Sequence, residues 1–184
     1  MTRNLVLFGM MGAGKSTVAR LVAARLGRAM VETDAHVERA AGRPIAEIFA
    51  TAGEAAFRRL ERDAVAGAAR RTDQVVSVGG GAVLDDTNVA TLRATGVLVL
   101  LDTPPDTLTA RLIRDADHRP LLHTPDLAGR VAELAAARGP RYAHVADHVV
   151  DATAAPADVA AAVVAWAADQ PDVLADHERA KATP

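Results

Sequence analysis

The sequence contains no cysteine and few aromatic residues. Without cysteine the protein forms neither disulfide bonds nor thiolate metal sites, which fits a reducing compartment. Aromatic residues make up 3% of the 184 residues, so the core is aliphatic, and base-stacking platforms for single-stranded nucleic acid are not expected. The formal net charge is only -2, with acidic and basic residues interspersed, which argues against nucleic acid or an anionic membrane as a partner.

Long apolar runs are also missing. No segment approaches the roughly 20 apolar residues that span a bilayer. The run Leu5–Phe8 leads into glycine-rich sequence and is too short for the core of a signal peptide. We therefore expect a cytoplasmic protein with no membrane segment. The length suits a single domain over residues 1–170, followed by a flexible tail over residues 171–184.

Lysine is nearly absent, because the chain has nineteen arginines but only Lys15 and Lys181. Lys15 lies in the segment Gly9–Ser16, G-M-M-G-A-G-K-S, which matches the P-loop pattern G-x-x-x-x-G-K-[ST]. Backbone N–H groups of such a loop cradle phosphates, the lysine reaches the terminal phosphates, and the serine hydroxyl binds Mg²⁺. Thr17 is placed to donate to the α-phosphate. The segment stands between a predicted strand and a predicted helix, so the sequence predicts nucleotide binding.

Short apolar runs alternate with helical patterns along the chain. The sequence predicts five strands, over Asn4–Phe8, Ala29–Val31, Val75–Val78, Val97–Leu101 and His148–Val150. It predicts helices over Lys15–Leu26, Ala35–Ala41, Ile45–Ala50, Gly53–Arg70, Asp86–Ala94, Pro105–Ile113, Leu127–Ala137 and Ala157–Ala167. This alternation is typical of an α/β protein with three α/β/α layers and a five-stranded parallel sheet. Ligands of such proteins bind beyond the carboxyl ends of the strands.

A P-loop alone leaves GTPases, ATPases and small-molecule kinases open. The guanine-reading pattern Asn-Lys-x-Asp is absent, and recombination or transport ATPases are usually longer chains. A small-molecule kinase needs only one domain, an acceptor pocket and a lid. Residues 114–125 are polar, carry two prolines and lack periodicity, so we expect them to form the lid. Arg119 within them is a candidate to neutralise charge on the transferring phosphoryl group.

Charged residues near the second strand and in the third helix are candidates for the acceptor site. Glu32 and Asp34 suit a water on Mg²⁺, the deprotonation of a hydroxyl, or a hydrogen bond to an acceptor alcohol. Asp34 is equally placed to cap the helix predicted from Ala35. Arg58 suits a bidentate clamp on a carboxylate, although pairing with Glu61 on the helix surface would explain it too.

The glycine run Gly79–Gly81 follows the third strand. Three glycines are costly in ordered structure, and they suit a ligand that lies against bare backbone, although a flexible turn is the alternative. Arg138 and Arg141 offer further anion contacts, or they are simply surface charge.

Taken together, these segments resemble the shikimate kinase family, which belongs to the nucleoside-monophosphate-kinase group of P-loop folds. The likeness covers about Asn4 to Ala168, and the segments G-M-M-G-A-G-K-S-T, G-R-P-I-A-E-I-F, G-E-A-A-F-R-R-L-E, V-G-G-G-A-V and R-P-L-L carry it. The resemblance implies a monomeric kinase that uses ATP and Mg²⁺. It would transfer the γ-phosphoryl group of ATP to the 3-hydroxyl of shikimate, on the pathway to chorismate and the aromatic amino acids.

The resemblance also implies roles for single residues. The implied catalytic residues are Lys15, Glu32, Asp34 and Arg119. The implied ATP-binding residues are Gly12, Ala13, Gly14, Lys15, Ser16, Thr17, Arg111, Arg119 and Pro156. The implied shikimate-binding residues are Asp34, Arg58, Gly79, Gly80, Gly81 and Arg138, with a substrate-binding region over about residues 33–61. Ser16 and Glu32 would hold Mg²⁺.

One residue departs from the family pattern, since the family usually has Asp-x-Asp where this chain has Glu32-Thr33-Asp34. Two other functions stay open at this point. One is a related kinase for another polyol acid, such as gluconate, or for a cyclitol. The other is an ATP-binding regulatory module without activity, although the presence of Lys15, Ser16, Asp34 and Arg119 argues against it.

Overall fold

Five parallel strands form the central sheet of the protein, for which a computed structural model describes residues 2–114 and 126–182. The strand order is β2-β3-β1-β4-β5, and all four pairings are parallel. The strands are β1 (Asn4–Phe8), β2 (Ala29–Glu32), β3 (Gln74–Ser77), β4 (Gly96–Asp102) and β5 (His148–Asp151). The predicted α/β fold with a five-stranded parallel sheet is therefore confirmed.

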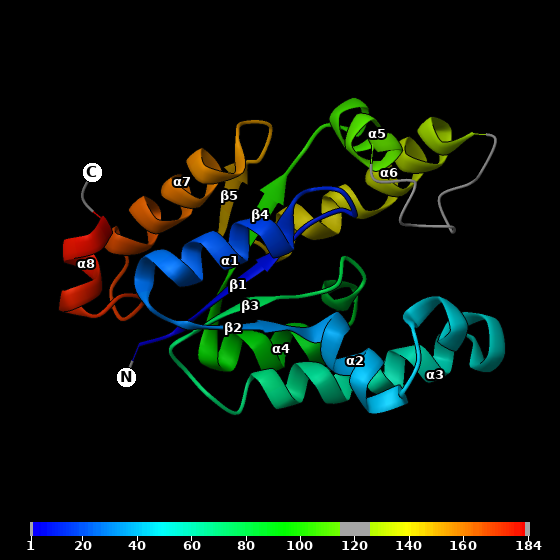
Figure 1. Cartoon of the computed structure of the whole chain (residues 1–184), viewed down its shortest axis with the longest axis horizontal. Coiled ribbons are helices and arrows are strands. Elements are labelled where there is room, and N and C mark those ends of the chain that lie inside the picture. The colour runs from blue at the N-terminus through cyan, green and yellow to red at the C-terminus, as the bar shows by residue number, and fades with distance from the viewer. Residues whose placement is uncertain (1, 115–125, 183–184) are drawn as a thin grey trace.

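Helices cover both faces of this sheet (Figure 1). They are α1 (Lys15–Leu26), α2 (Thr33–Ala41), α3 (Ile45–Ala68), α4 (Asp86–Thr95), α5 (Pro105–Arg114), α6 (Leu127–Val145), α7 (Pro156–Asp169) and α8 (Asp176–Ala182). The helix α1 packs against α7 and α8 on one face, while α4 and α6 pack against β4 on the other. No helix in the described part of the chain is long and apolar enough to cross a membrane.

The inner strands are apolar because both of their faces are covered. Every residue of β1, at the centre of the sheet, is buried, and β4 beside it is buried from Gly96 to Leu101. Continuous apolar runs of this kind are typical of buried parallel strands. Strand β4 lies one position from the centre of the sheet, beside β1.

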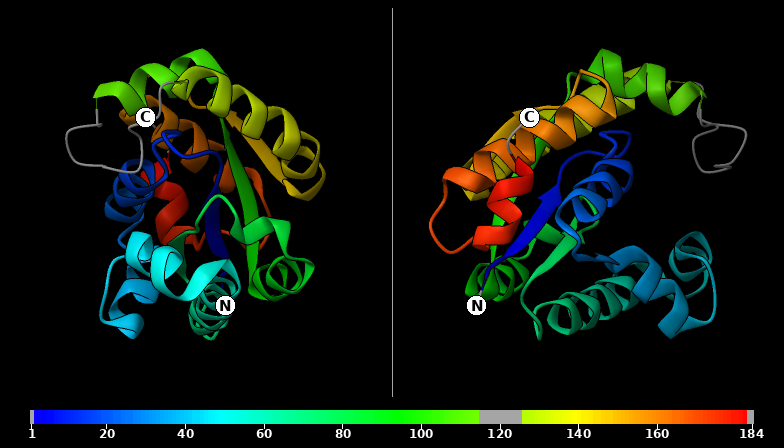
Figure 2. Two further views of the ribbon diagram at one scale, coloured as in Figure 1. Left: turned by 90° about the vertical axis from the view of Figure 1, so that its right-hand side faces the viewer. Right: turned by 60° about the vertical axis from the view of Figure 1, so that its left-hand side comes forward.

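The carboxyl ends of the strands open between two groups of helices. In the two views of Figure 2, α2 and the first part of α3 lie on one side of these ends, and α5 and α6 lie on the other. The P-loop follows β1, the middle strand, and therefore lies between the two groups. This arrangement determines where a ligand can lie.

Most predicted helices lie within two residues of their predicted bounds, but α3 and α6 depart from the prediction in other ways. Helix α3 runs from Ile45 to Ala68 with a break at Gly53, whose φ of 76° and ψ of 174° are not helical, so the predicted interruption is confirmed there. Helix α6 was predicted to end at Ala137, but it continues through Pro140 to Val145. A proline usually ends a helix because it lacks an N–H. Here the extension buries the side chains of Tyr142 and Val145, which favours helix beyond the proline.

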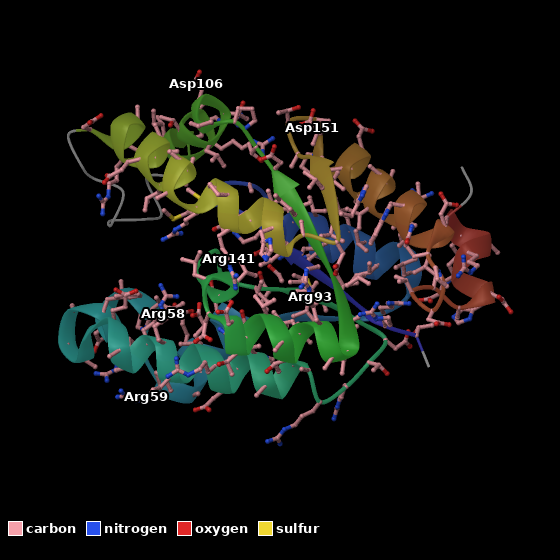
Figure 3. The ribbon with its side chains drawn as sticks, turned by 180° about the vertical axis from the view of Figure 1, so that it is seen from behind. Arg58, Arg59, Arg93, Asp106, Arg141 and Asp151 are labelled. Atoms are coloured by element: carbon pink, nitrogen blue, oxygen red, sulfur yellow. The ribbon has the colours of Figure 1, made fainter. Side chains whose placement is uncertain are left out.

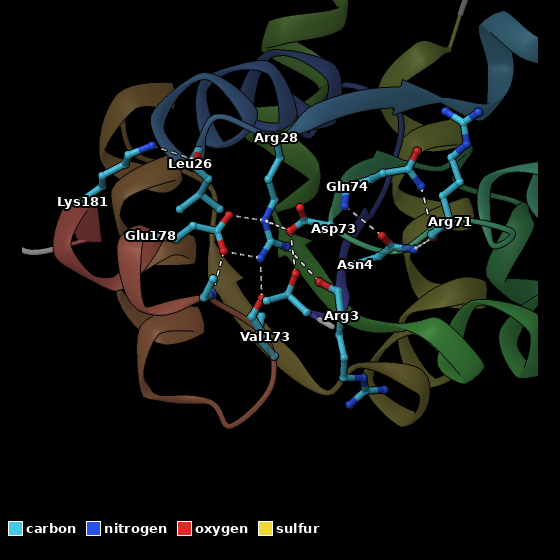
Figure 4. Close-up of polar contacts among 12 residues, drawn as sticks. Arg3, Asn4, Leu26, Arg28, Arg71, Asp73, Gln74, Val173, Glu178 and Lys181 are labelled. Carbon is cyan, nitrogen blue, oxygen red and sulfur yellow. Dashed lines mark hydrogen bonds and ion pairs between the residues drawn. The ribbon is translucent and has the colours of Figure 1, made fainter.

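The described residues after α7, up to Ala182, are packed rather than loose, whereas the sequence predicted a flexible tail from residue 171. Val173 and Leu174 are buried, and α8 lies beside α1. The buried guanidinium of Arg28 donates to both carboxylate oxygens of Glu178, at 2.6 and 2.7 Å, and to the carbonyl oxygen of Val173 (Figure 4). Sequence patterns miss this pairing because Arg28 and Glu178 are 150 residues apart.

Replacing Glu178 with glutamine is expected to lower the free energy of unfolding by about 2 kcal/mol, because the buried guanidinium of Arg28 loses a charged hydrogen-bond partner. Burial acts to raise the pKa of Glu178, but hydrogen bonds from Arg28 and from the Ala175 N–H outweigh it and lower the pKa. The carboxylate therefore stabilises the fold above the ordinary glutamate pKa, and this contribution is lost as the pH falls through the lowered pKa.

Urea unfolding of the unchanged protein and of Glu178→Gln measures the difference in the free energy of unfolding. The measurement is repeated from above the ordinary glutamate pKa to below the lowered pKa of Glu178. The matched control is Glu133→Gln, which removes the carboxylate from an exposed pair with Arg130 and should change stability by less than about 0.5 kcal/mol. Equal losses for the two variants would contradict a stabilising role of the buried pair.

Candidate active site

The P-loop opens α1 and has the geometry of a phosphate cradle. Gly14 caps the helix with a φ of 86° and a ψ of 16°, a left-handed conformation that glycine adopts without strain. A Cβ built at Gly14 would meet no atom within 4 Å, so this side of the loop is open. The ammonium group of Lys15 donates to the carbonyl oxygen of Met10 at 3.0 Å, which holds the charge over the loop.

One large cavity extends from the P-loop toward the helices on either side of it. Its volume is about 950 Å³, a size that holds a nucleotide and a small acceptor together. The predicted phosphate-binding residues Gly12 to Thr17 line one part of it, and Arg111 and Pro156 line another. The predicted acceptor residues Glu32, Asp34, Gly80 and Arg138 line the same cavity.

Glu32 and Asp34 reach the cavity from the end of β2 and the start of α2. The helix begins at Thr33, and Glu32 is its N-cap residue without a capping hydrogen bond from its side chain. Asp34 lies inside the first turn, so the alternative prediction that it caps the helix is wrong. Ser77, which is paired with Glu32 across β2 and β3, lines the cavity beside these carboxylates.

The glycine run Gly79–Gly81 is crowded by charged side chains. A Cβ built at Gly79 would lie 2.7 Å from Oδ1 of Asp34, and one at Gly81 would clash with Nη1 of Arg58. Any side chain at either position would displace these groups. Positive φ does not explain the run, since none of the three glycines has it. Glycine at these positions lets the side chains of Asp34 and Arg58 pack directly against the backbone.

Arg58 is held by two carboxylates of its own helix. Its Nε and Nη2 donate to Glu54 at 3.2 and 2.9 Å, and its Nη1 donates to Glu61 at 2.7 Å. These three bonds leave one N–H on each terminal nitrogen, and a Cβ built at Gly81 would meet both terminal nitrogens before any other atom. The predicted pairing with Glu61 therefore exists, and it does not prevent Arg58 from presenting its terminal edge to the glycine run.

Glu61 is an unusual residue, because its carboxylate is nearly inaccessible to solvent. Burial raises the pKa of Glu61, and the charges of Asp34 and Asp85 add to this, while Arg58 acts in the opposite direction. The ion pair with Arg58 compensates for the burial of this carboxylate. Sequence reasoning considered Glu61 only as a surface partner, and the spacing E-x-x-x-R-x-x-E around Arg58 was the signal for the pairs with Glu54 and Glu61.

Arg111 of α5 and Arg138 of α6 both line the cavity, but they have different neighbours. The guanidinium of Arg111 donates to the carbonyl oxygens of Ala152 and Thr153, at 2.7 and 3.3 Å, and so holds the loop that precedes Pro156. Arg138 approaches Gly80, with Nη1 at 3.7 Å from a Cβ built on that glycine. Arg141 instead donates to the Val83 carbonyl and pairs with Asp86, so it anchors α6 to the segment after the glycine run.

The predicted lid lies almost entirely outside the described residues. Arg119 and the rest of residues 115–125 belong to the segment that the structure does not describe. The described chain before this segment ends in α5, and it resumes at Asp126, directly before α6.

Comparison with known proteins gives consistent matches. The family model described as shikimate kinase matches residues 11–168. The shikimate kinase of Symbiobacterium thermophilum is 52% identical over 144 residues, which cover 78% of this chain and 83% of that protein. That of Novosphingobium aromaticivorans is 44% identical over 172 residues, covering 91% and 88% of the two chains. A solved shikimate kinase from Acinetobacter baumannii, in complex with shikimate, aligns with a TM-score of 0.84 at 33% identity, covering 90% and 93%.

Proposed function

Since this chain belongs to the shikimate kinase family, we propose that it transfers the γ-phosphoryl group of ATP to the 3-hydroxyl of shikimate, giving shikimate 3-phosphate and ADP. The observation that carries the proposal is one cavity lined by the P-loop and by the acceptor residues Asp34, Gly80 and Arg138. A nucleotide and a small acid in this cavity would meet, and such proximity lowers the barrier to transfer.

The residues divide into two groups under this proposal. Gly12 to Thr17 hold the phosphates through backbone N–H groups, and Lys15 places a positive charge on the transferred group. At the acceptor end, Arg58 and Arg138 grip the carboxylate of shikimate. Asp34 accepts a hydrogen bond from the ring hydroxyl that attacks and orients it toward the γ-phosphorus.

Mg²⁺ fits the oxygen donors on the P-loop side. Ser16 and Glu32 line one cavity, and magnesium prefers such oxygen ligands while it keeps several waters and substrate phosphates in its shell. When bound, the ion would neutralise charge on the phosphates during transfer. Arg119 as a further neutralising group, the monomeric state and the cytoplasmic location remain predictions.

An assay of ADP release tests the function. With Mg-ATP, we expect a strong response to shikimate and no more than a background rate with gluconate or without acceptor. A response to gluconate alone would support the related polyol-acid kinase. No response to either acceptor would support the inactive ATP-binding module.

Replacing Glu32 with aspartate is expected to retain turnover or to raise it. Glutamate is one methylene longer than aspartate, about 1.5 Å of extra reach. A carboxylate that meets Mg²⁺ through a water tolerates this difference because the water shifts. Measuring kcat across a range of Mg²⁺ concentrations checks this expectation, with Glu38→Asp, another acidic residue that lines the cavity, as the control. If Glu32→Asp abolished turnover while both substrates still bound, Glu32 would not act through the metal's water shell.

A further inference from the structure

Tyr142 is a buried residue of α6 that the proposed function does not use. It lies four residues after Arg138, and its side chain is 3% exposed. Its hydroxyl donates to the carbonyl oxygen of Gly80 at 2.6 Å, across 62 residues of sequence. Its ring packs edge-on against Phe8, with ring centroids 5.6 Å apart and an interplanar angle of 87°. Tyr142 therefore joins α6 to the last residue of β1 and to the middle of the glycine run.

Arg138 approaches the same hydroxyl. A Cβ built at Gly80 would lie 3.1 Å from the Tyr142 hydroxyl and 3.7 Å from Nη1 of Arg138, so both groups crowd one backbone position. Burial raises the pKa of Tyr142, while the charge and hydrogen bond of Arg138 oppose the rise. The hydroxyl stays protonated at neutral pH. It donates to the carbonyl oxygen of Gly80, and its oxygen keeps a lone pair that can accept from the neighbouring guanidinium of Arg138.

We infer that Tyr142 is a positioning residue for the acid-binding end of the site. Its hydroxyl fixes the guanidinium of Arg138 relative to the Gly79–Gly81 backbone. This role rests on the proposed function of Arg138 as a carboxylate clamp. A guanidinium that is already oriented loses less side-chain freedom when a carboxylate binds, so the acid binds more tightly.

Attachment of α6 to the rest of the molecule is a different role, and contacts other than the Tyr142 hydroxyl provide it. Arg141, the preceding residue, donates to the Val83 carbonyl at 3.0 Å and pairs with Asp86. Figure 3 shows Arg141 between α6 and the segment that follows the glycine run. The aromatic ring of Tyr142 packs against Phe8 without a contribution from the hydroxyl. Removing the hydroxyl alone therefore separates positioning from helix attachment.

The test is Tyr142→Phe, which keeps the ring and removes the hydroxyl. One lost hydrogen bond of about 1 kcal/mol corresponds to a roughly fivefold rise in the KM for shikimate. The KM for ATP should change by less than twofold, and the thermal midpoint should stay close to that of the unchanged protein. The control Arg141→Gln should lower the thermal midpoint and leave the ratio of the two KM values unchanged.

A second measurement tests whether the rise in the KM for shikimate depends on Arg138. In an Arg138→Ala background, Tyr142→Phe should add no further rise in the KM for shikimate. An unchanged KM for shikimate in the single variant, equal rises for both substrates, or a full effect in the Arg138→Ala background would each overturn the inference. Absence of shikimate-dependent ADP release from the unchanged protein would instead overturn the proposed function, and the role of Tyr142 with it.

Discussion

Replacing Lys15 with methionine is expected to lower kcat for phosphoryl transfer by about a thousandfold, while the protein stays folded. The ammonium group lies over the phosphate loop, bound to the Met10 carbonyl, and lines the cavity in which the transferred group would lie. A preorganised charge at the developing transition state contributes several kcal/mol to catalysis. Methionine has nearly the same length and no charge, so the variant tests the charge rather than the packing. Single-turnover ADP release measures the loss.

The sequence offers a matched control in its other lysine. Lys181, exposed on α8, donates to the Leu26 carbonyl at 3.2 Å, away from the cavity. Lys181→Met should leave kcat and both KM values unchanged. A loss of less than tenfold for Lys15→Met, or equal losses for the two variants, would show that the ammonium group of Lys15 does not act on the transferred phosphate.

Replacing Arg58 with alanine is expected to raise the KM for shikimate about a hundredfold and the KM for ATP by less than threefold. A charged, bidentate contact to a carboxylate is lost, and such contacts contribute on the order of 2–3 kcal/mol. The terminal nitrogens of Arg58 face Gly81. The next residue in the glycine run, Gly80, lines the cavity together with Arg138. Initial rates with each substrate varied in turn give the two KM values.

Two further variants separate binding from folding. Arg59→Ala removes the exposed neighbour, which points away from the centre of the molecule (Figure 3), and should change neither KM. Arg58→Ala also leaves the buried carboxylate of Glu61 without a hydrogen-bond partner that lowers its pKa. The double variant Arg58→Ala/Glu61→Gln should recover thermal stability without recovering the KM for shikimate. Recovery of both, or equal rises in the two KM values, would mean that Arg58 has a structural role only.

Much of the fold was predictable because its signals are local. The P-loop is a contiguous segment, and β1 and β4 are continuous apolar runs whose burial follows from composition alone. Gly53 interrupts α3 because its backbone conformation suits glycine, so the break was visible in the sequence. The candidate site residues Lys15, Asp34 and Arg138 do line one cavity.

The features that sequence reasoning missed depend on distant partners. Helix α6 extends past Pro140 because Tyr142 and Val145 are buried, and no local pattern outweighs the proline. Residues 171–182 are ordered by Arg28, which lies far away in sequence. For Gly79–Gly81 the sequence predicted a backbone surface for a ligand. It did not predict the crowding by Asp34 and Arg58, because that crowding comes from tertiary packing.

The distribution of the two lysines has a practical consequence. One ε-amine lines the nucleotide cavity and the other lies on the last helix, so an acylating reagent can modify only two side-chain amines in the whole protein. Mass spectrometry of the peptides that contain Lys15 and Lys181 measures the extent of acylation of both lysines in one sample. Reduced acylation of Lys15 reports the fraction of molecules with an occupied cavity, and acylation of Lys181 serves as the internal standard.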